Sequence, residues 1–168
     1  MDTGSSAQVN GSAGFSRCGR YRYWLRREWD STLPQCAFIG LNPSTADAQT
    51  DDTTLRRCIG FAKKWEYGSL LLVNLFSLRA TDPAILCTVS DPVGPATNRW
   101  LRRAGAESQL LVAAWGNGGR LFDRATSVAR LIHNVQCLGV TAKGMPRHPL
   151  YCPKRSSLIP YHPLGSHH

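Results

Sequence analysis

Four short segments of the chain carry side chains able to take part in catalysis or ligand binding: residues 40–44 (G-L-N-P-S), Asn74, residues 115–119 (W-G-N-G-G) and residues 144–151 (G-M-P-R-H-P-L-Y). Their amide, hydroxyl and imidazole groups can hold a water molecule, hydrogen-bond a planar ligand or transfer a proton. Taken singly, each segment also has a structural interpretation as a turn, a strand end or a loop. They indicate a site only if the fold brings them together.

Three aspartates, Asp47, Asp51 and Asp52, follow the first of these segments. A carboxylate can take a proton from a water, which the amide of Asn42 cannot do. Capping of the helix that follows is the alternative for Asp51 and Asp52, and for one of the two we favour it over catalysis.

The elements that must position these residues can be predicted from the spacing of apolar residues. Four apolar runs are typical of strands buried on both faces: residues 35–40, 69–75, 109–115 and 134–140. Helical spacing lies between them, over residues 55–65, 95–104 and 121–132. This alternation predicts a three-layer α/β/α fold with a central four-stranded parallel sheet, and the four polar segments are expected beyond the carboxyl ends of its strands.

The length of 168 residues and the 42% hydrophobic content favour one domain, which we place at residues 17–164. The Gly/Ser-rich residues 1–16 are predicted to form a flexible tail, and residues 165–168 have the composition of a tag remnant. The chain shows neither an apolar run of membrane-spanning length nor an export signal. We therefore expect a cytoplasmic monomer that does not bind a membrane.

Charge and cysteine usage narrow the class of partner. Twenty Lys and Arg against eleven Asp and Glu give a formal net charge of +9, which favours a polyanion such as DNA. The six cysteines are scattered without a C-x-x-C pair, so neither a metal site nor another cofactor is expected, and the cysteines are interpreted as reduced.

In order and placement, the four segments resemble those of the uracil-DNA glycosylase superfamily. Its members carry a G-x-N-P or G-x-D-P loop after the first strand, a strand that ends in Asn, and a late His-Pro loop. The resemblance spans roughly residues 35–160 and is most specific to a bacterial and phage branch. The motifs of that branch, G-L-N-P-S-x-A-D, N-L-F-x-x-R-A-T-D-P and G-x-P-R-H-P-L-Y, match residues 40–47, 74–83 and 144–151.

The resemblance implies a uracil-DNA glycosylase-like fold and a monofunctional enzyme that hydrolyses the bond between a base and its deoxyribose. Such a bond breaks through an oxocarbenium-like sugar while negative charge grows on the departing base. Asn42 would position the attacking water, with help from an aspartate such as Asp47 or Asp51. His148 would donate a hydrogen bond, or present positive charge, to the base.

Base and DNA binding are assigned in the same way. Asn74, Ser44 and Asp52 would bind the base, with the amide of Asn74 pairing with a pyrimidine edge. A base in duplex DNA must be flipped out, which calls for a wedge and for cations that hold the phosphates. The expected wedges are Leu150 and Tyr151. The expected cations are Arg147, Lys154, Arg155, Lys143 and Arg79.

One departure from the family pattern bears on the substrate. Characterised uracil enzymes keep an aromatic residue after the first motif, but residues 44–58 hold none and are rich in Asp and Thr. These side chains suit a base with several hydrogen-bond donors. We therefore expect a modified pyrimidine, such as the glucosylated hydroxymethylcytosine of phage DNA, and a role in antiviral defence.

Two alternatives remain open. The same loops could hydrolyse a free nucleotide or nucleoside, or the chain could be a DNA-binding module of the same fold without turnover, since Asn42 stands where a carboxylate would take the proton. A phosphate-loop enzyme is disfavoured, because residues 116–119 lack the Lys-Ser/Thr pair that holds phosphate and metal.

Overall fold

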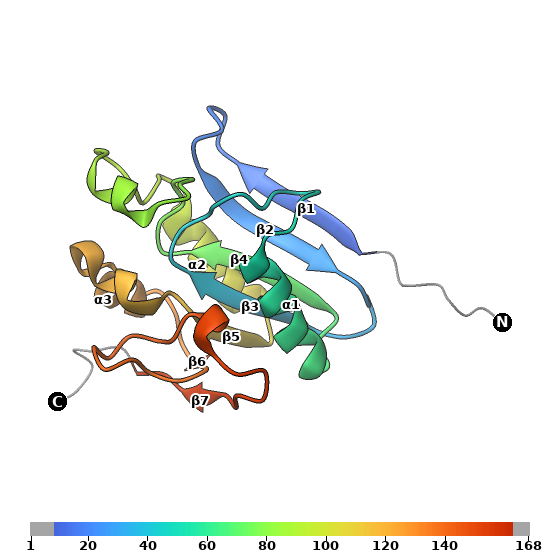
Figure 1. Cartoon of the computed structure of the whole chain (residues 1–168). Helices are drawn as coiled ribbons and strands as arrows, with labels where there is room; N and C mark the ends of the chain where they lie inside the picture. The colour runs from blue at the N-terminus through green and yellow to red at the C-terminus, as the bar shows by residue number, and fades with distance from the viewer. Residues whose placement is uncertain (1–8, 163–168) are drawn as a thin grey trace.

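The computed structural model describes residues 9–162 and contains one seven-stranded mixed sheet, so the chain is of the α/β class (Figure 1). The strands run in the order β1-β2-β4-β3-β5-β6-β7 across the sheet. Their bounds are β1 Asn10–Phe15, β2 Arg22–Glu28, β3 Gln35–Gly40, β4 Ser69–Asn74, β5 Leu110–Ala113, β6 Val135–Cys137 and β7 Ile159–Pro160.

Strands β3, β4, β5 and β6 fall within the four apolar runs, although β5 and β6 are shorter than the predicted 109–115 and 134–140; every residue of β4 and β5 is buried. β3 pairs in parallel with β4 and β5, and β5 pairs in parallel with β6. The predicted sheet of four strands was too small, because β1 and β2 extend it on one side and β7 on the other, all through antiparallel pairing. β2 was missed because its sequence, R-Y-W-L-R-R-E, is too charged to be typical of a buried strand.

The amino-terminal segment differs from the prediction of a flexible tail over residues 1–16. Residues 10–15 form β1, whose backbone pairs with β2 from Asn10 opposite Glu28 to Phe15 opposite Arg22. Backbone pairing with a neighbour offsets the weak strand propensity of its Gly and Ser residues. Residues 1–8 and 163–168, which include the predicted tag remnant at 165–168, lie outside the described residues.

Helices lie on both faces of the sheet. α1 (Thr53–Lys64) packs through Leu55, Cys58 and Phe61 on one face, while α2 (Thr97–Glu107) and α3 (Arg124–Ala129) pack on the other. Three short 3-10 helices lie in the connections: η1 Pro83–Cys87, η2 Gly116–Asp123 and η3 Pro149–Tyr151. No helix of the described chain is both long and apolar enough to pass through a bilayer.

Two helix bounds differ from the prediction. α2 continues through Gly105 to Glu107, where the prediction had it end at residue 104. The helix predicted over residues 121–132 is reduced to α3, because Phe122 and Asp123 adopt left-handed backbone angles with φ of 53° and 55° and break the turn before it. Apolar spacing continued across this break, so the sequence pattern did not reveal it.

Candidate functional site

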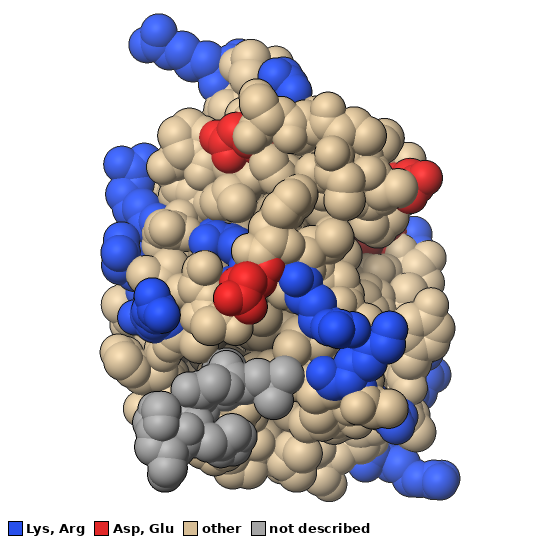
Figure 2. Space-filling model, turned by 90° about the vertical axis from the view of Figure 1, so that its left-hand side faces the viewer, with Lys and Arg blue, Asp and Glu red and all other residues tan. Residues whose placement is uncertain are grey.

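The polar segments meet at the edge of the sheet where the parallel strands end. Gly40 and Asn74 end β3 and β4, Trp115 follows β5, and His148 lies in the long connection after β6. They surround a pocket of about 350 Å³. Figure 2 views the molecule from the side on which β3 and β4 end in Figure 1, and Lys and Arg side chains flank this face. The fold therefore places a small pocket, lined by polar and apolar side chains, on a face that Lys and Arg side chains flank.

Asn42 lies in the pocket wall with its amide orientation determined by its neighbours. Its Nδ2 donates to the carbonyl oxygens of Pro43, at 3.0 Å, and of Ala80, at 2.8 Å. A carbonyl oxygen only accepts, so the nitrogen must face these two groups. The oxygen Oδ1 is left as the hydrogen-bond acceptor of this side chain. Asn42 can thus hold a water by accepting one of its hydrogens.

His148 lines the same pocket and also caps η3. Its Nδ1 accepts a hydrogen bond from the Leu150 backbone N–H at 3.2 Å, so the proton of the neutral ring is on Nε2. Burial lowers the pKa of His148 below its usual 6.5, and the Asp52 carboxylate opposes part of that effect. At neutral pH the ring is a neutral Nε2–H donor. Of the two roles predicted for it, this environment favours the hydrogen bond over the positive charge.

Asp52 caps α1, as one of the two interpretations of the sequence had it, and also lies in the pocket lining. Its Oδ1 accepts from the Leu55 backbone N–H at 2.8 Å, which caps α1, and the residue lines the pocket. Its charge acts on Arg22 and His148, and it raises the pKa of each against the effect of burial. Among the described residues, Asp52 is the one acidic residue in the pocket lining.

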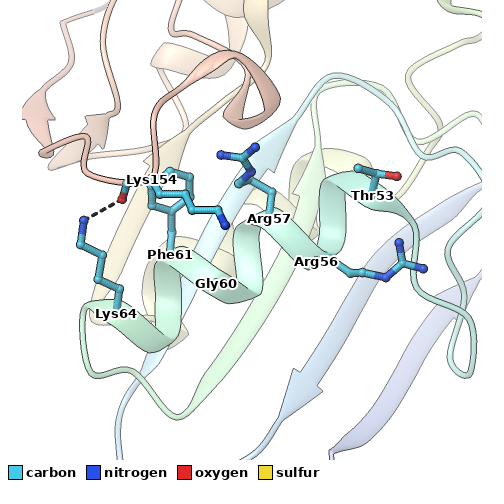
Figure 3. A pocket seen from close by; sticks show the side chains of 7 residues that line it. All are labelled: Thr53, Arg56, Arg57, Gly60, Phe61, Lys64 and Lys154. Atoms are coloured by element: carbon cyan, nitrogen blue, oxygen red, sulfur yellow. Dashed lines mark hydrogen bonds between the residues drawn. The ribbon is translucent and has the colours of Figure 1, made fainter.

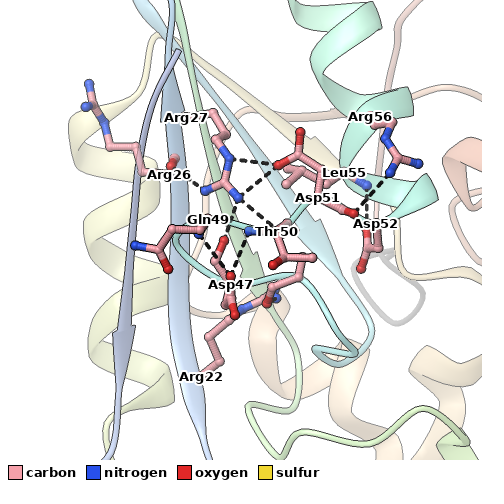
Figure 4. A network of polar contacts seen from close by, with 11 residues as sticks. Arg22, Arg26, Arg27, Asp47, Gln49, Thr50, Asp51, Asp52, Leu55 and Arg56 are labelled. Carbon is pink, nitrogen blue, oxygen red and sulfur yellow. Dashed lines mark hydrogen bonds and ion pairs between the residues drawn. The ribbon is translucent and has the colours of Figure 1, made fainter. Parts of the chain in front are cut away.

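Asp47 and Asp51, both predicted to help the water, lie outside the pocket lining. Asp47 accepts from the backbone N–H groups of Gln49, at 2.9 Å, and Thr50, at 2.7 Å. Asp51 forms an ion pair of 2.9 Å with the buried Arg27 of β2, which also donates to the carbonyl oxygens of Asp47 and Thr50 (Figure 4). The Asp51 side chain therefore holds the loop against β2, whereas the Asp47 carboxylate stabilises a turn within the loop. Sequence could not separate three aspartates of one loop, because the separation depends on which of them meets Arg27.

Asn74 and Gly40 face each other at the ends of β4 and β3. Asn74 is 3% exposed, and its Nδ2 has no hydrogen-bond partner among the described residues. A Cβ on residue 40 would lie 2.7 Å from Asn74 Oδ1, so only glycine leaves the amide where it is. Ser44 lines the same pocket. The three residues predicted to bind a base, Asn74, Ser44 and Asp52, are thus brought together.

Arg22, the first residue of β2, lines the pocket and was missed. It is 2% exposed; its Nη1 donates to the Ala46 carbonyl oxygen at 2.8 Å, and its Nε has no partner among the described residues. Burial lowers the pKa of Arg22 to about 10, so the guanidinium stays charged at neutral pH. Trp115, another residue of the lining, is 1% exposed. No local signal in R-Y-R-Y-W-L-R-R, residues 20–27, distinguishes a buried arginine from an exposed one.

The predicted wedges lie at the pocket. Leu150 and Tyr151 line it, and Tyr151 is 78% exposed with its ring centroid 5.9 Å from that of His148. Arg147 and Lys143 are exposed in the loop before η3.

The remaining predicted cations, Lys154, Arg155 and Arg79, are also absent from the pocket lining. Lys154 and Arg155 are exposed beyond η3, and Lys154 lies beside α1. Arg79 is bound to the β1–β2 turn, with its guanidinium 4.8 Å from the Phe15 ring centroid and its Nη1 donating to the Gly19 carbonyl oxygen. Arg147 lines an adjoining hollow that shares His148 and Tyr151 with the pocket, and neither Arg147 nor Arg79 belongs to the pocket lining.

Comparison with known families gives one match. The model of a family described as "Protein of unknown function (DUF1643)" matches residues 22–150, more than half of the chain, and the chain belongs to that family. The matched range includes the whole pocket lining except Tyr151. Neither a curated protein nor a solved structure matched the chain.

Proposed function

We propose that this protein is a DNA glycosylase that hydrolyses the N-glycosidic bond of a modified pyrimidine and leaves an abasic site. The observation that carries the proposal is the composition of one pocket, which combines the oriented acceptor of Asn42, the neutral donor of His148 and the buried cation of Arg22. The parallel strands β4-β3-β5-β6 with helices on both faces support a uracil-DNA glycosylase-like fold.

The attacking water would be held by Asn42 and deprotonated by Asp52. Asn42 Oδ1 accepts one hydrogen of the water and so directs an oxygen lone pair toward the anomeric carbon of the sugar. Asp52 keeps carboxylate oxygen in the pocket beside its capping bond and takes the proton as the carbon–oxygen bond forms. Its negative charge also stabilises the oxocarbenium-like sugar.

The departing base would be stabilised by His148 and Arg22. As the glycosidic bond breaks, the bonding electron pair moves onto the base, which becomes anionic. A hydrogen bond from His148 Nε2–H and the charge of Arg22 both oppose that build-up of negative charge. Because Arg22 is almost fully buried, little solvent screens its field.

The pocket's unpaired donors indicate which edge of a base it receives. Arg22 and Asn74 line the pocket, and each has a buried donor, Nε and Nδ2, without a partner among the described residues, so a side-chain rotation that brings these donors to acceptors of a ligand would remove a desolvation penalty. The carbonyl and ring-nitrogen acceptors of a pyrimidine meet this requirement. Asp52, Ser44 and Thr54 offer acceptors to the donors of a hydroxylated or glycosylated substituent. Glucosylated hydroxymethylcytosine in phage DNA combines both features, which supports a role in antiviral defence.

An abasic-site assay tests the proposal. DNA duplexes with uracil, a thymine mismatch, hydroxymethylcytosine or glucosylated hydroxymethylcytosine are incubated with the protein, and alkali converts abasic sites into strand breaks. We expect cleavage of a modified cytosine substrate, reduced at least 100-fold by Asn42→Ala and by His148→Ala.

Other outcomes separate the alternatives. Absence of breaks across the panel, together with tight salt-sensitive binding, would contradict catalysis and favour a DNA-binding module. Release of a base from free nucleotides without breaks in DNA would favour a nucleotide N-glycosidase instead.

A further inference from the structure

A second hollow, of about 500 Å³, lies along the outer side of α1 (Figure 3). We call it the α1 groove. Its cations are Arg56, Arg57, Lys64 and Lys154, and Gly60 and Phe61 lie between them. We call the pocket lined by Asn42, Asp52 and His148 the base pocket, after its proposed ligand, and the α1 groove shares no lining residue with it.

The α1 groove is lined by four cations, of which Arg56 donates to the Asp51 carbonyl oxygen at 3.2 Å near the start of the helix. α1 has the sequence T-T-L-R-R-C-I-G-F-A-K-K, without an acidic residue, and none of the described residues that line the groove is Asp or Glu. Arg57 donates to the Cys152 carbonyl oxygen at 3.0 Å, and Lys64 donates to that of Lys154 at 2.6 Å. These bonds hold residues 152–154 as one wall of the groove. Each uses one hydrogen of a group that has several, so donors remain for an anion.

Gly60 is a second and independent indication of a ligand. It lies in the middle of α1, where glycine lowers helix stability relative to alanine. A Cβ built on it would meet no heavy atom of the described chain within 4 Å, and its helical backbone does not require glycine. Packing within the protein therefore gives no reason for glycine here. A ligand backbone that lies against the helix would provide one.

The α1 groove continues from the base pocket along two segments. Asp52 and Thr54 line the pocket, and Arg56 follows within the same stretch of helix. Tyr151 lies at the pocket, and Lys154 follows three residues later. At a rise of about 1.5 Å per residue, Arg56 and Lys64 are about 12 Å apart along the helix axis, roughly the axial length of three to four nucleotides of a duplex strand.

We propose that the α1 groove binds the sugar-phosphate backbone of the DNA strand to one side of the base that enters the pocket. Arg56, Arg57, Lys64 and Lys154 contact successive phosphates, and Gly60 lets the strand lie against the helix. The identity of the strand as substrate rests on the proposed function. Binding is measurable without turnover, so the two proposals can fail separately.

The test measures binding of a fluorescently labelled DNA duplex by anisotropy over a range of salt concentrations. For Arg56→Gln/Lys154→Gln we expect the slope of log K against log salt to become shallower by about two, since each lost phosphate contact removes about 0.9. The matched control is Arg99→Gln/Arg102→Gln, which removes the same charge from exposed positions of α2 on the opposite face. We expect its slope to change by less than half as much. Equal effects of the two double variants would overturn the proposal.

Gly60→Met provides a measurement that a solely structural role would not predict. Methionine is a better helix former than glycine, so the melting temperature should stay the same or rise, while the side chain fills the groove and weakens DNA binding about tenfold or more. Unchanged affinity in a folded Gly60→Met protein would contradict the groove as a DNA site. Equally tight binding of polyglutamate, with the same dependence on the variants, would contradict a nucleic-acid partner.

The abasic-site assay distinguishes the two failures. If the wild type cleaves DNA and the groove variants bind and cleave it as tightly and as fast as the wild type, the α1 groove is not a DNA site and the glycosylase proposal stands. If no DNA is cleaved but the groove variants, unlike the control, lower the salt dependence of binding, the α1 groove is a DNA site and the glycosylase proposal fails.

Discussion

At the scale of single residues, Arg22 is the clearest sign that this edge of the sheet is built for binding and not for stability. A charged guanidinium that is 2% exposed, and that forms no ion pair within the described residues, costs desolvation free energy without full compensation. Arg22 Nε and Asn74 Nδ2 have no hydrogen-bond partner among the described residues, and both residues line the same pocket. An anionic or acceptor-rich ligand would satisfy both.

Replacing this cation should therefore separate stability from activity. Arg22→Met keeps the bulk of the side chain; it removes the buried charge but also leaves the Ala46 carbonyl oxygen without its donor, so we expect only a small change in melting temperature. We expect base release to fall by about 100-fold or more, the typical loss when one stabilising group of a developing anion is removed. Thermal denaturation and the abasic-site assay measure the two effects. Arg26→Met on the same strand is the control, since Arg26 is partly exposed and pairs with Glu28, and it should cleave at the wild-type rate.

The environment of His148 predicts a pH dependence of stability. Its pKa in the folded protein is below the usual 6.5, mainly through burial, so folding favours the neutral ring. The stability that this ring contributes is present above about pH 6.5 and is lost as the pH falls through the lowered pKa. His148→Asn can still cap η3 but does not titrate.

We therefore expect the free energy of unfolding of the wild type, relative to His148→Asn, to decrease between pH 7.5 and pH 5. Urea denaturation at several pH values measures this difference. A difference that is constant, or that increases toward acid, would show that the folded protein does not favour the neutral ring.

At the scale of elements, the loop of residues 41–52 is positioned by β2. The buried Arg27 side chain contacts Asp51 and two carbonyl oxygens of this loop, and Asp52 attaches the end of the loop to α1. The same loop holds Asn42 and Asp52 in the pocket wall. Pocket geometry therefore depends on a contact outside the pocket.

The pair of Arg27 and Asp51 gives a test of the roles within this loop. Arg27→Met should lower the free energy of unfolding by about 1–3 kcal/mol, because it leaves loop carbonyl groups without their donor. It should also speed amide hydrogen exchange at residues 47–51 and reduce base release. Denaturation, exchange measured by mass spectrometry and the abasic-site assay give the three quantities.

Asp51→Asn is the matched variant, since it keeps a hydrogen-bond acceptor for Arg27 and removes the carboxylate. We expect it to retain most activity. If a folded Asp51→Asn protein no longer releases the base while Asp52→Asn still does, then Asp51, and not Asp52, accepts the proton of the water.

At the scale of the whole molecule, the sheet gathers residues that are far apart in the chain. β3 and β4 end at the pocket edge because they run in parallel. β2 runs antiparallel to β4, so its first residue, Arg22, lies at the edge where β4 finishes with Asn74. The backbone N–H of Arg22 donates to the Ser77 carbonyl oxygen at 2.9 Å, just beyond that end. One antiparallel strand thus adds a cation to a site otherwise built from the connections of parallel strands.

The sequence by itself determined the four apolar strands, their approximate bounds and the segments that surround the pocket. Burial on both faces requires continuous apolar runs, and a connection that follows a strand must begin at that strand's end, so both are local properties. For this reason the sequence alone was enough to select Asn42, Asn74 and His148 as candidate site residues.

Tertiary structure alone decided the rest. Strands β1, β2 and β7 owe their form to backbone pairing with partners distant in sequence, which no local pattern encodes. The same holds for the burial of Arg22 and for which of Asp47, Asp51 and Asp52 lies in the pocket lining. Identical side chains in one loop differ only in what the fold places against them. Arg27 forms an ion pair with Asp51, whereas Asp52 lines the pocket.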